Sequence, residues 1–177
     1  MNQVIIIAEA GQNHNGKLKL AYKLVDVAKK CGADFIKFQT SIPKLHISKF
    51  AKKANYQIKN WGQRESQLQM LQKISLTYED FKKLKKYCNR KKIQFLSTPF
   101  DLQSIDFLKN FNMKYFKIPS GEITNLPYLI KVAKLKKKII YQQLKKWNMF
   151  LLVCKVIKIR KHICISVLVV SIILNPK

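Results

Sequence analysis

Residues 4–38 read VIIIAEAGQNHNGKLKLAYKLVDVAKKCGADFIKF, and the residues that follow continue the pattern set here. The apolar run Val4–Ala8 predicts a buried strand. Apolar residues then recur at helical spacing from Leu18 to Ala28, and Gly32 ends the predicted helix. Phe35–Phe38 predicts a second strand. A strand, a helix and another strand in this order are typical of a parallel β-α-β unit.

The same alternation returns after a long segment, Thr40–Arg64, whose length indicates a functional loop. Strands are predicted at Ile93–Leu96, Tyr115–Ile118 and Lys138–Ile140, and helices at Leu68–Ile74, Thr77–Cys88, Leu102–Lys109 and Asn125–Leu135. This order predicts the α/β class, as an incomplete TIM-type (β/α)8 barrel of about the first four to five βα units or as a small open sheet. A complete barrel needs about 250 residues, and this chain has 177.

The composition changes abruptly near residue 140. The chain has 35 Lys and Arg against 9 Asp and Glu, a formal net charge of +26. All the acids lie between Glu9 and Glu122, and no glycine follows Gly121. Because alternating elements need turn residues between them, we expect residues 1–140 to form the α/β part and residues 141–177 to be a separate basic and apolar tail.

Neither end of the chain carries a recognisable membrane or export signal. The first residues lack a basic region, and the longest apolar run, Ile163–Leu174, is too short for a transmembrane span. The four cysteines are widely spaced and form no C-x-x-C pair. The expected location is therefore the cytoplasm, with the cysteines as thiols.

Polar side chains follow the predicted strands at their carboxyl ends, where function resides in parallel α/β folds. The first strand ends at Glu9, the second at Lys37, the third at Ser97-Thr98, and the fourth at Lys117, with Ser120 just beyond. A lysine among apolar strand residues is costly unless it meets an anion. Two such lysines with nearby hydroxyl groups predict a site for a phosphate or a carboxylate.

Simpler interpretations stay open for each of these residues. A lysine at a strand end is commonly a solvated rim residue, and Glu9 is equally compatible with an ion pair to a lysine. Ser120-Gly121-Glu122 also fits a plain turn that begins a helix. Asn13-His14-Asn15-Gly16 is typical of a turn rather than of a metal site.

Five ordered motifs between Val4 and Ile140 closely resemble the N-acetylneuraminate (sialic acid) synthase family, which includes the legionaminate and pseudaminate synthases. The motifs are Ile7–Gly11, Asn13–Gly16, Lys37–Thr40, Leu96–Asp101 and Phe116–Glu122, and Thr124–Pro127 continues the match. The resemblance implies a TIM barrel that condenses phosphoenolpyruvate with an N-acetylated hexosamine such as N-acetylmannosamine. The products are a nonulosonic acid, which is a nine-carbon 2-keto acid, and inorganic phosphate.

The resemblance also implies roles for single residues. Lys37, Thr98, Lys117 and Ser120 would hold the carboxylate and phosphate of phosphoenolpyruvate, and they coincide with the strand-end cluster. Gln39 and Glu122, with Asn60 by a looser match, would contact the sugar. Glu9 would lie near the aldehyde and help to move a proton. We therefore expect Glu9, Lys37 and Lys117 to be catalytic and the others to bind substrate.

Two features depart from the family. Its divalent metal, manganese or magnesium, is held by two histidines on later strands, and nothing in this chain matches them, so we assign no metal ligand. The family continues its fifth strand into Ser-Thr-Gly-Met, whereas Tyr141-Gln142-Gln143 follows here. Codons for Tyr-Gln-Gln can encode Ser-Thr in another frame. We therefore expect a frameshift near residue 140, a tail unrelated to the family, and an inactive fragment.

The high positive charge supports a competing hypothesis. A basic surface gives salt-dependent affinity for phosphates in any protein, and the tail mixes apolar runs with lysine and arginine as membrane-surface segments do. No nucleic-acid motif is present, and biased codon usage explains the lysines more simply, so no specific nucleic-acid partner is expected. Self-association as a homodimer is compatible with half a barrel, whose open strand edges also favour aggregation.

Overall fold

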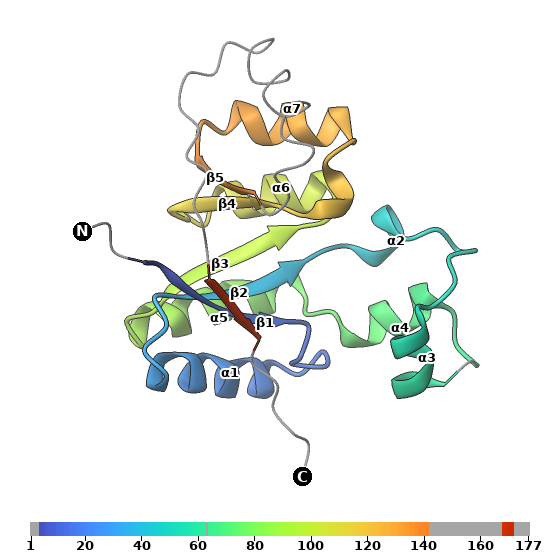
Figure 1. Ribbon diagram of the computed structural model, residues 1–177, viewed down its shortest axis with the longest axis horizontal. Helices are drawn as coiled ribbons and strands as arrows, with labels where there is room; N and C mark the ends of the chain where they lie inside the picture. Colours follow the sequence, from blue (N-terminus) through green and yellow to red (C-terminus); the bar gives the residue numbers. More distant parts are fainter. Residues whose placement is uncertain (1–3, 63, 142–167, 172–177) are drawn as a thin grey trace.

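The structure is a computed structural model that describes residues 4–62, 64–141 and 168–171. All of its paired strands are parallel, in one sheet of order β3-β2-β1-β6 and a second of order β4-β5 (Figure 1). The strands are β1 (Ile6–Gly11), β2 (Phe35–Thr40), β3 (Gln94–Pro99), β4 (Tyr115–Ile118), β5 (Lys138–Tyr141) and β6 (Leu168–Ser171). This confirms the α/β class with the strand arrangement of a TIM-type barrel, which the described strands do not close.

Helices follow the strands, and α1, α4, α5, α6 and α7 lie where the sequence pattern predicts helices. They are α1 (Leu18–Lys30), α2 (Pro43–His46), α3 (Asn55–Trp61), α4 (Gln67–Ile74), α5 (Tyr78–Arg90), α6 (Leu102–Lys109) and α7 (Leu126–Lys134), with a 3-10 turn η1 (Ser120–Glu122). Gly32 ends α1 with a φ of +75°, a conformation that glycine adopts without strain. Thr77 caps α5, because its Oγ1 accepts a hydrogen bond of 3.1 Å from the Asp80 amide.

The core lies between the strands and the helices that cover one side of them. The largest fully buried side chains include Phe38, Phe95 and Phe116 from three strands, with Phe81 of α5 and Tyr128 of α7. Burying a large aromatic side chain stabilises the fold by roughly 1.5–3 kcal/mol. This packing holds the carboxyl ends of β1 to β4 at one end of the molecule.

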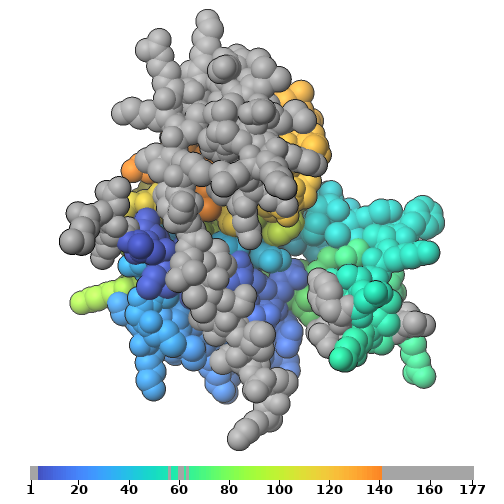
Figure 2. Space-filling model, viewed as in Figure 1, coloured from blue at the N-terminus to red at the C-terminus, as the bar shows by residue number. Residues whose placement is uncertain are grey.

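The connection between β2 and α5 differs from the predicted loop. It contains α2, α3 and α4, and Figure 2 shows that these residues form a projection beside the rest of the chain. A small apolar cluster of Met70, Leu71 and Ile74, with Ile47 against it, holds the projection together. The prediction of a loop over residues 40–64 was therefore wrong in part, since two short helices lie within it.

The strand β6 changes the expected picture of the tail. Residues 142–167 and 172–177 of the predicted tail lie outside the described residues. The backbone of β6 pairs with β1 in parallel register, from Ile6 opposite Leu168 to Glu9 opposite Ser171. The expectation of open strand edges was thus wrong for the outer edge of β1 over these four residues. In the described part of the chain, no helix is long and apolar enough to cross a membrane.

Candidate active site

Glu9 and Lys37 form an ion pair at the carboxyl ends of β1 and β2. The parallel register sets their Cα atoms opposite each other, and the Lys37 Nζ contacts Glu9 Oε2. The Lys37 side chain is only 4% exposed, whereas that of Glu9 is 21% exposed. The ion pair left open by the sequence is therefore present, and it is largely shielded from solvent.

Lys117, near the end of β4, is the second buried lysine of the site. It is 6% exposed. Burial and, to a smaller extent, the positive charge of Lys37 lower the pKa of its ammonium group to about 8, although the Glu9 carboxylate acts in the opposite direction. The protonation of Lys117 therefore responds to the charges of both Lys37 and Glu9. The cluster carries two positive charges and one negative charge, so it favours an added anion.

A hydroxyl and an amide lie beside this cluster. Thr98 on β3 lies opposite Gln39 on β2, and its buried Oγ1 has no hydrogen-bond partner among the described residues. The buried Oε1 of Glu9 also lacks a hydrogen-bond partner there. An ideal Cβ on Gly11 would lie 3.4 Å from Glu9 Oε1 and 3.6 Å from Gln39 Nε2, so these two side chains flank one glycine. Buried polar atoms of this kind are ordinarily hydrogen-bonded by water or by a ligand.

Ser97 takes a different role from the one predicted. We expected its hydroxyl to face an anion, but Ser97 Oγ lies 2.7 Å from Thr40 Oγ1, and both residues are fully buried. This hydroxyl pair joins β2 to β3 directly beneath the strand ends. Thr98, rather than Ser97, therefore supplies the uncommitted hydroxyl.

Asp101 has a structural role that the analysis of the strand ends did not predict. Its carboxylate accepts hydrogen bonds from the Ser104 amide at 2.7 Å and from the Ile42 amide at 2.8 Å. It thereby caps α6 and ties the β3 end to the start of the β2–α5 connection. An Asp directly before a helix is an N-cap signal, but its second bond to a residue 59 positions away is not visible in a sequence.

Ser120 and Glu122 lie in η1, just beyond β4. Ser120 is exposed, and the Glu122 carboxylate accepts a hydrogen bond of 2.6 Å from Asn125. Glu122 also lines a cavity of about 460 Å³ together with His46, Phe100 and Tyr128 among other residues. The turn predicted at Ser120-Gly121-Glu122 is therefore present, and its last residue, Glu122, faces this cavity.

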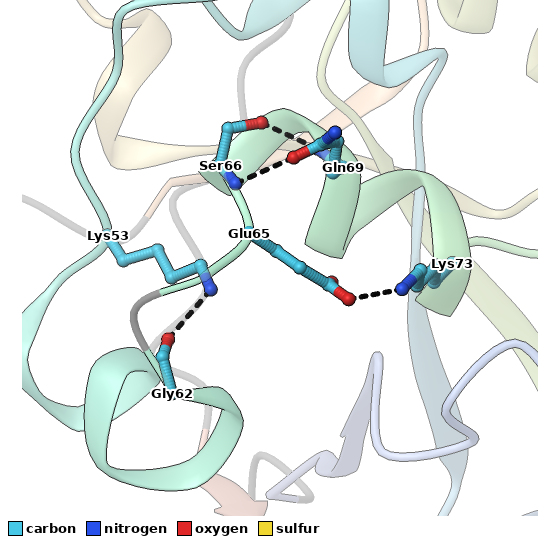
Figure 3. A network of polar contacts seen from close by, with 6 residues as sticks. All are labelled: Lys53, Gly62, Glu65, Ser66, Gln69 and Lys73. Carbon is cyan, nitrogen blue, oxygen red and sulfur yellow. Dashed lines mark hydrogen bonds and ion pairs between the residues drawn. The ribbon is translucent and has the colours of Figure 1, made fainter.

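Asn60 lies in α3, in the projection formed by the β2–α5 connection (Figure 1). The contacts that hold this part of the projection are shown in Figure 3. Lys53 donates a 2.9 Å hydrogen bond to the carbonyl of Gly62, and Glu65 pairs with Lys73. Asn60 therefore comes from a separate element and not from the strand ends that carry the lysine cluster.

His14 occupies the turn after β1, as the sequence predicted. The Gly16 amide donates to its Nδ1 at 3.2 Å, and the ring lies 6.1 Å from the ring of Phe38. Burial lowers the pKa of the imidazole to about 4. A neutral, buried imidazole that packs against an aromatic ring is typical of a histidine in the hydrophobic core.

The residues at this site do not fit the divalent metal that the resemblance implies. Across the described ranges, no group of three or more His, Cys, Asp and Glu side chains is placed to hold a metal ion. His46 lies in α2, where its Nδ1 is 3.3 Å from the carbonyl oxygen of Ile42, and His162 lies outside the described residues.

Parallel strands alternating with helices define an α/β protein of the TIM-barrel type, and buried charges and an unsatisfied hydroxyl lie at the carboxyl ends of its strands. The family model described as "NeuB family" matches residues 24–143, and the chain belongs to this family.

Two curated relatives illustrate how far the similarity extends. N,N'-diacetyllegionaminic acid synthase of Campylobacter jejuni is 57% identical over 140 residues, which are 79% of this chain and 42% of the relative. The human N-acetylneuraminate-9-phosphate synthase is 35% identical over 130 residues, 73% of this chain and 36% of the relative. The chain therefore spans well under half the length of these two relatives.

The fold is also similar to that of solved structures. The N-acetylneuraminic acid (sialic acid) synthetase of Leptospira borgpetersenii aligns with a TM-score of 0.71 and 25% identity, over 97% of this chain and 55% of that chain. A truncated 3-deoxy-D-arabino-heptulosonate 7-phosphate synthase of Thermotoga maritima aligns with a TM-score of 0.58 and 8% identity, over 92% of this chain and 51% of that chain. The second likeness concerns the fold alone.

Proposed function

We propose that this chain carries the phosphoenolpyruvate-binding part of a nonulosonic acid synthase, whose acceptor is an N-acetylated hexosamine. The family membership supports this, as does the 57% identity to a diacetyllegionaminic acid synthase. The observation that carries the proposal is the buried Glu9, Lys37 and Lys117 cluster beside the unsatisfied hydroxyl of Thr98.

The charges of this cluster suit phosphoenolpyruvate, which carries a carboxylate and a phosphate. Glu9 neutralises part of the Lys37 charge, so the excess positive charge comes from Lys117. Thr98 Oγ1 would donate to one of the anionic groups and so satisfy its own buried hydroxyl. Ser120 would complete this set from η1, while Gln39, Glu122 and Asn60 would contact the sugar.

The proposed reaction forms one carbon–carbon bond and releases phosphate. C3 of phosphoenolpyruvate bonds to the aldehyde carbon of the open-chain sugar, and the aldehyde oxygen takes up a proton. Water adds at C2, and the bond between C2 and the bridging oxygen of the phosphate group breaks. The products are a 2-keto acid and inorganic phosphate. Glu9 would move the proton at the aldehyde oxygen, and its Oε1, buried at the strand ends without a hydrogen-bond partner in the described structure, supports this role.

We further propose that residues 1–140 are the part of this chain that belongs to the synthase. The chain alone would not catalyse the condensation. The family match ends at residue 143, close to the change in composition. A frameshift near residue 140 accounts for the acid-free tail. Reading the gene beyond this codon in the other two frames tests it, since a Ser-Thr-Gly strand end and later histidines should appear there.

Calorimetric titration of phosphoenolpyruvate into the full chain tests the binding proposal. Replacing Lys117→Met or Thr98→Val should weaken binding by about tenfold or more, because each removes a group that contacts the anion. Lys83→Met, on the exposed side of α5, is the matched control and should bind like the unmodified chain. Equal affinity in all four proteins would contradict the assignment.

A second assay tests the absence of turnover. Phosphate release is measured with phosphoenolpyruvate, N-acetylmannosamine and manganese, and none above background is expected. Release that depends on the sugar and is lost in Lys117→Met would show that the chain is active by itself.

A further inference from the structure

The opposite end of the molecule, where the strands begin, carries a concentration of positive charge that the proposed synthase site does not use. The last turns of α1 and α7 and the α5–β3, α6–β4 and α7–β5 connections, which lie at this end (Figure 1), carry lysines. We call it the basic end and define it by the exposed residues Lys29, Lys30, Lys92, Lys114, Lys134 and Lys136. It lies at the far ends of the strands from Glu9, Lys37 and Lys117.

A cavity of about 580 Å³ opens at the basic end. Lys29, Lys92 and Lys114 line it, together with the starts of the first three strands. The Lys29 Nζ donates a 2.9 Å hydrogen bond to the backbone carbonyl of Lys92, so it uses no acidic partner in this contact. Asp34 is the acid that lines the cavity, and one of its oxygens already accepts a 2.8 Å hydrogen bond from the Ile6 amide.

Helix geometry accounts for only part of this charge. Lysines in the last turn of a helix interact favourably with the helix dipole, and this explains Lys29, Lys30 and Lys134. Lys92 and Lys136 lie outside the helices, with φ values of 54° and 53°. This left-handed conformation ordinarily favours glycine or asparagine. Helix stability therefore gives no reason for lysine at these two positions.

The width of the basic end indicates the size of its partner. Adjacent strands lie about 4.8 Å apart, so the turns that precede β2 to β5 extend over at least about 14 Å. A duplex nucleic acid presents about eight phosphate charges over that length, since it carries one per about 1.7 Å. A single small anion would meet one or two of these lysines, whereas a phosphate backbone meets many.

We propose that the basic end binds the phosphate backbone of nucleic acid without sequence preference. Charge complementarity favours this partner. A lipid surface is less suitable, because most of the large exposed apolar residues among those described, Leu45, Phe50, Leu102 and Leu126, lie in the segments that follow the carboxyl ends of the strands. Of that set only Val4 lies at the basic end, so little apolar surface there can enter a bilayer.

Fluorescence anisotropy with a labelled duplex of about 20 base pairs, from about 50 to about 300 mM NaCl, tests this proposal. The test protein is the full chain with Lys29→Gln, Lys92→Gln and Lys114→Gln. Its plot of log affinity against log salt should become shallower by up to about 2.7, which is about 0.9 for each lost phosphate contact. The affinity near 100 mM salt should fall by about tenfold or more.

The matched control carries Lys23→Gln, Lys83→Gln and Lys86→Gln on exposed helix surfaces and has the same net charge as the test protein. It should keep the slope and affinity of the unmodified chain. Equal losses in both triple variants would overturn the proposal, because they would show an effect of net charge alone. Binding to anionic lipid vesicles, lost only in the test protein, with no duplex binding by the unmodified chain would also overturn it and identify a lipid surface instead.

Discussion

Replacing Lys117 by methionine should make this protein more stable and, at the same time, weaken its anion binding. The buried ammonium has a pKa of about 8 instead of its ordinary value of 10.5. Such a difference corresponds to a cost of about 3 kcal/mol for keeping the charged form buried. Methionine has a similar length and no charge, so Lys117→Met should raise the free energy of unfolding near pH 7 by up to about 3 kcal/mol.

The sign of the pH dependence makes this prediction specific. Between pH 8 and 10.5 the unfolded chain holds the Lys117 proton while the folded chain has released it. The unmodified protein therefore gains stability, relative to the variant, as the pH rises through this range. The advantage of Lys117→Met should be complete below pH 8 and vanish near pH 10.5.

Urea unfolding of the two proteins at several pH values measures this difference. Lys37→Met is the contrasting variant: it leaves Glu9 without its ion-pair partner and should destabilise the fold by about 3 kcal/mol. If Lys117→Met were as destabilising as Lys37→Met near pH 7, or if its effect did not change with pH, the assigned burial cost would be wrong.

Three further predictions concern the turn after β1, the tail and the anion site. Gly16→Ala should lower the free energy of unfolding by about 2 kcal/mol or more, because φ is +71° and a Cβ would collide with the Lys73 carbonyl; a loss below 0.5 kcal/mol in urea unfolding would contradict this. A chain that ends at Tyr141 should aggregate more in light scattering, because it lacks β6 and leaves the outer edge of β1 without a paired strand; an unchanged monomer fraction would count against it. Phosphoenolpyruvate affinity, by calorimetry, should fall as the pH rises above 8 and Lys117 loses its proton; constant affinity up to pH 10 would exclude a charged Lys117 from the site.

Elements with a complete local signal were predictable from the sequence. The helix Leu102–Lys109 and the strand Tyr115–Ile118 have the predicted bounds, and Thr77 caps its helix as expected. The strands β2 and β3 run further than predicted, because Thr40 and Pro99 are paired in the sheet although neither is a typical apolar strand residue. The hydrophobic periodicity of a sequence indicates which residues are buried, so it cannot define the end of a strand that runs into polar residues.

The site was predictable as a set of strand ends but not in its pairings. Parallel topology alone brings Glu9 and Lys37 to one edge. That Ser97 is committed to Thr40 while the neighbouring Thr98 keeps a free hydroxyl depends on which face of the strand each side chain takes. The helices α2 and α3 and the strand β6 were missed, because short segments gain their stability from tertiary contacts rather than from propensity.

The positions of the charged groups imply that anion binding and acceptor binding are separable in this chain. Glu9, Lys37, Thr98 and Lys117 come from consecutive units β1 to β4, all within the first 120 residues. Two buried ammonium groups against one carboxylate destabilise the folded chain until an anion offsets the excess charge. Phosphoenolpyruvate should therefore raise the melting temperature of this chain, whereas N-acetylmannosamine added alone, which has no negative charge to offset the buried ammonium groups, should raise it less. A shift of equal size with the sugar alone would show that the acceptor site is already complete within the first half of the barrel.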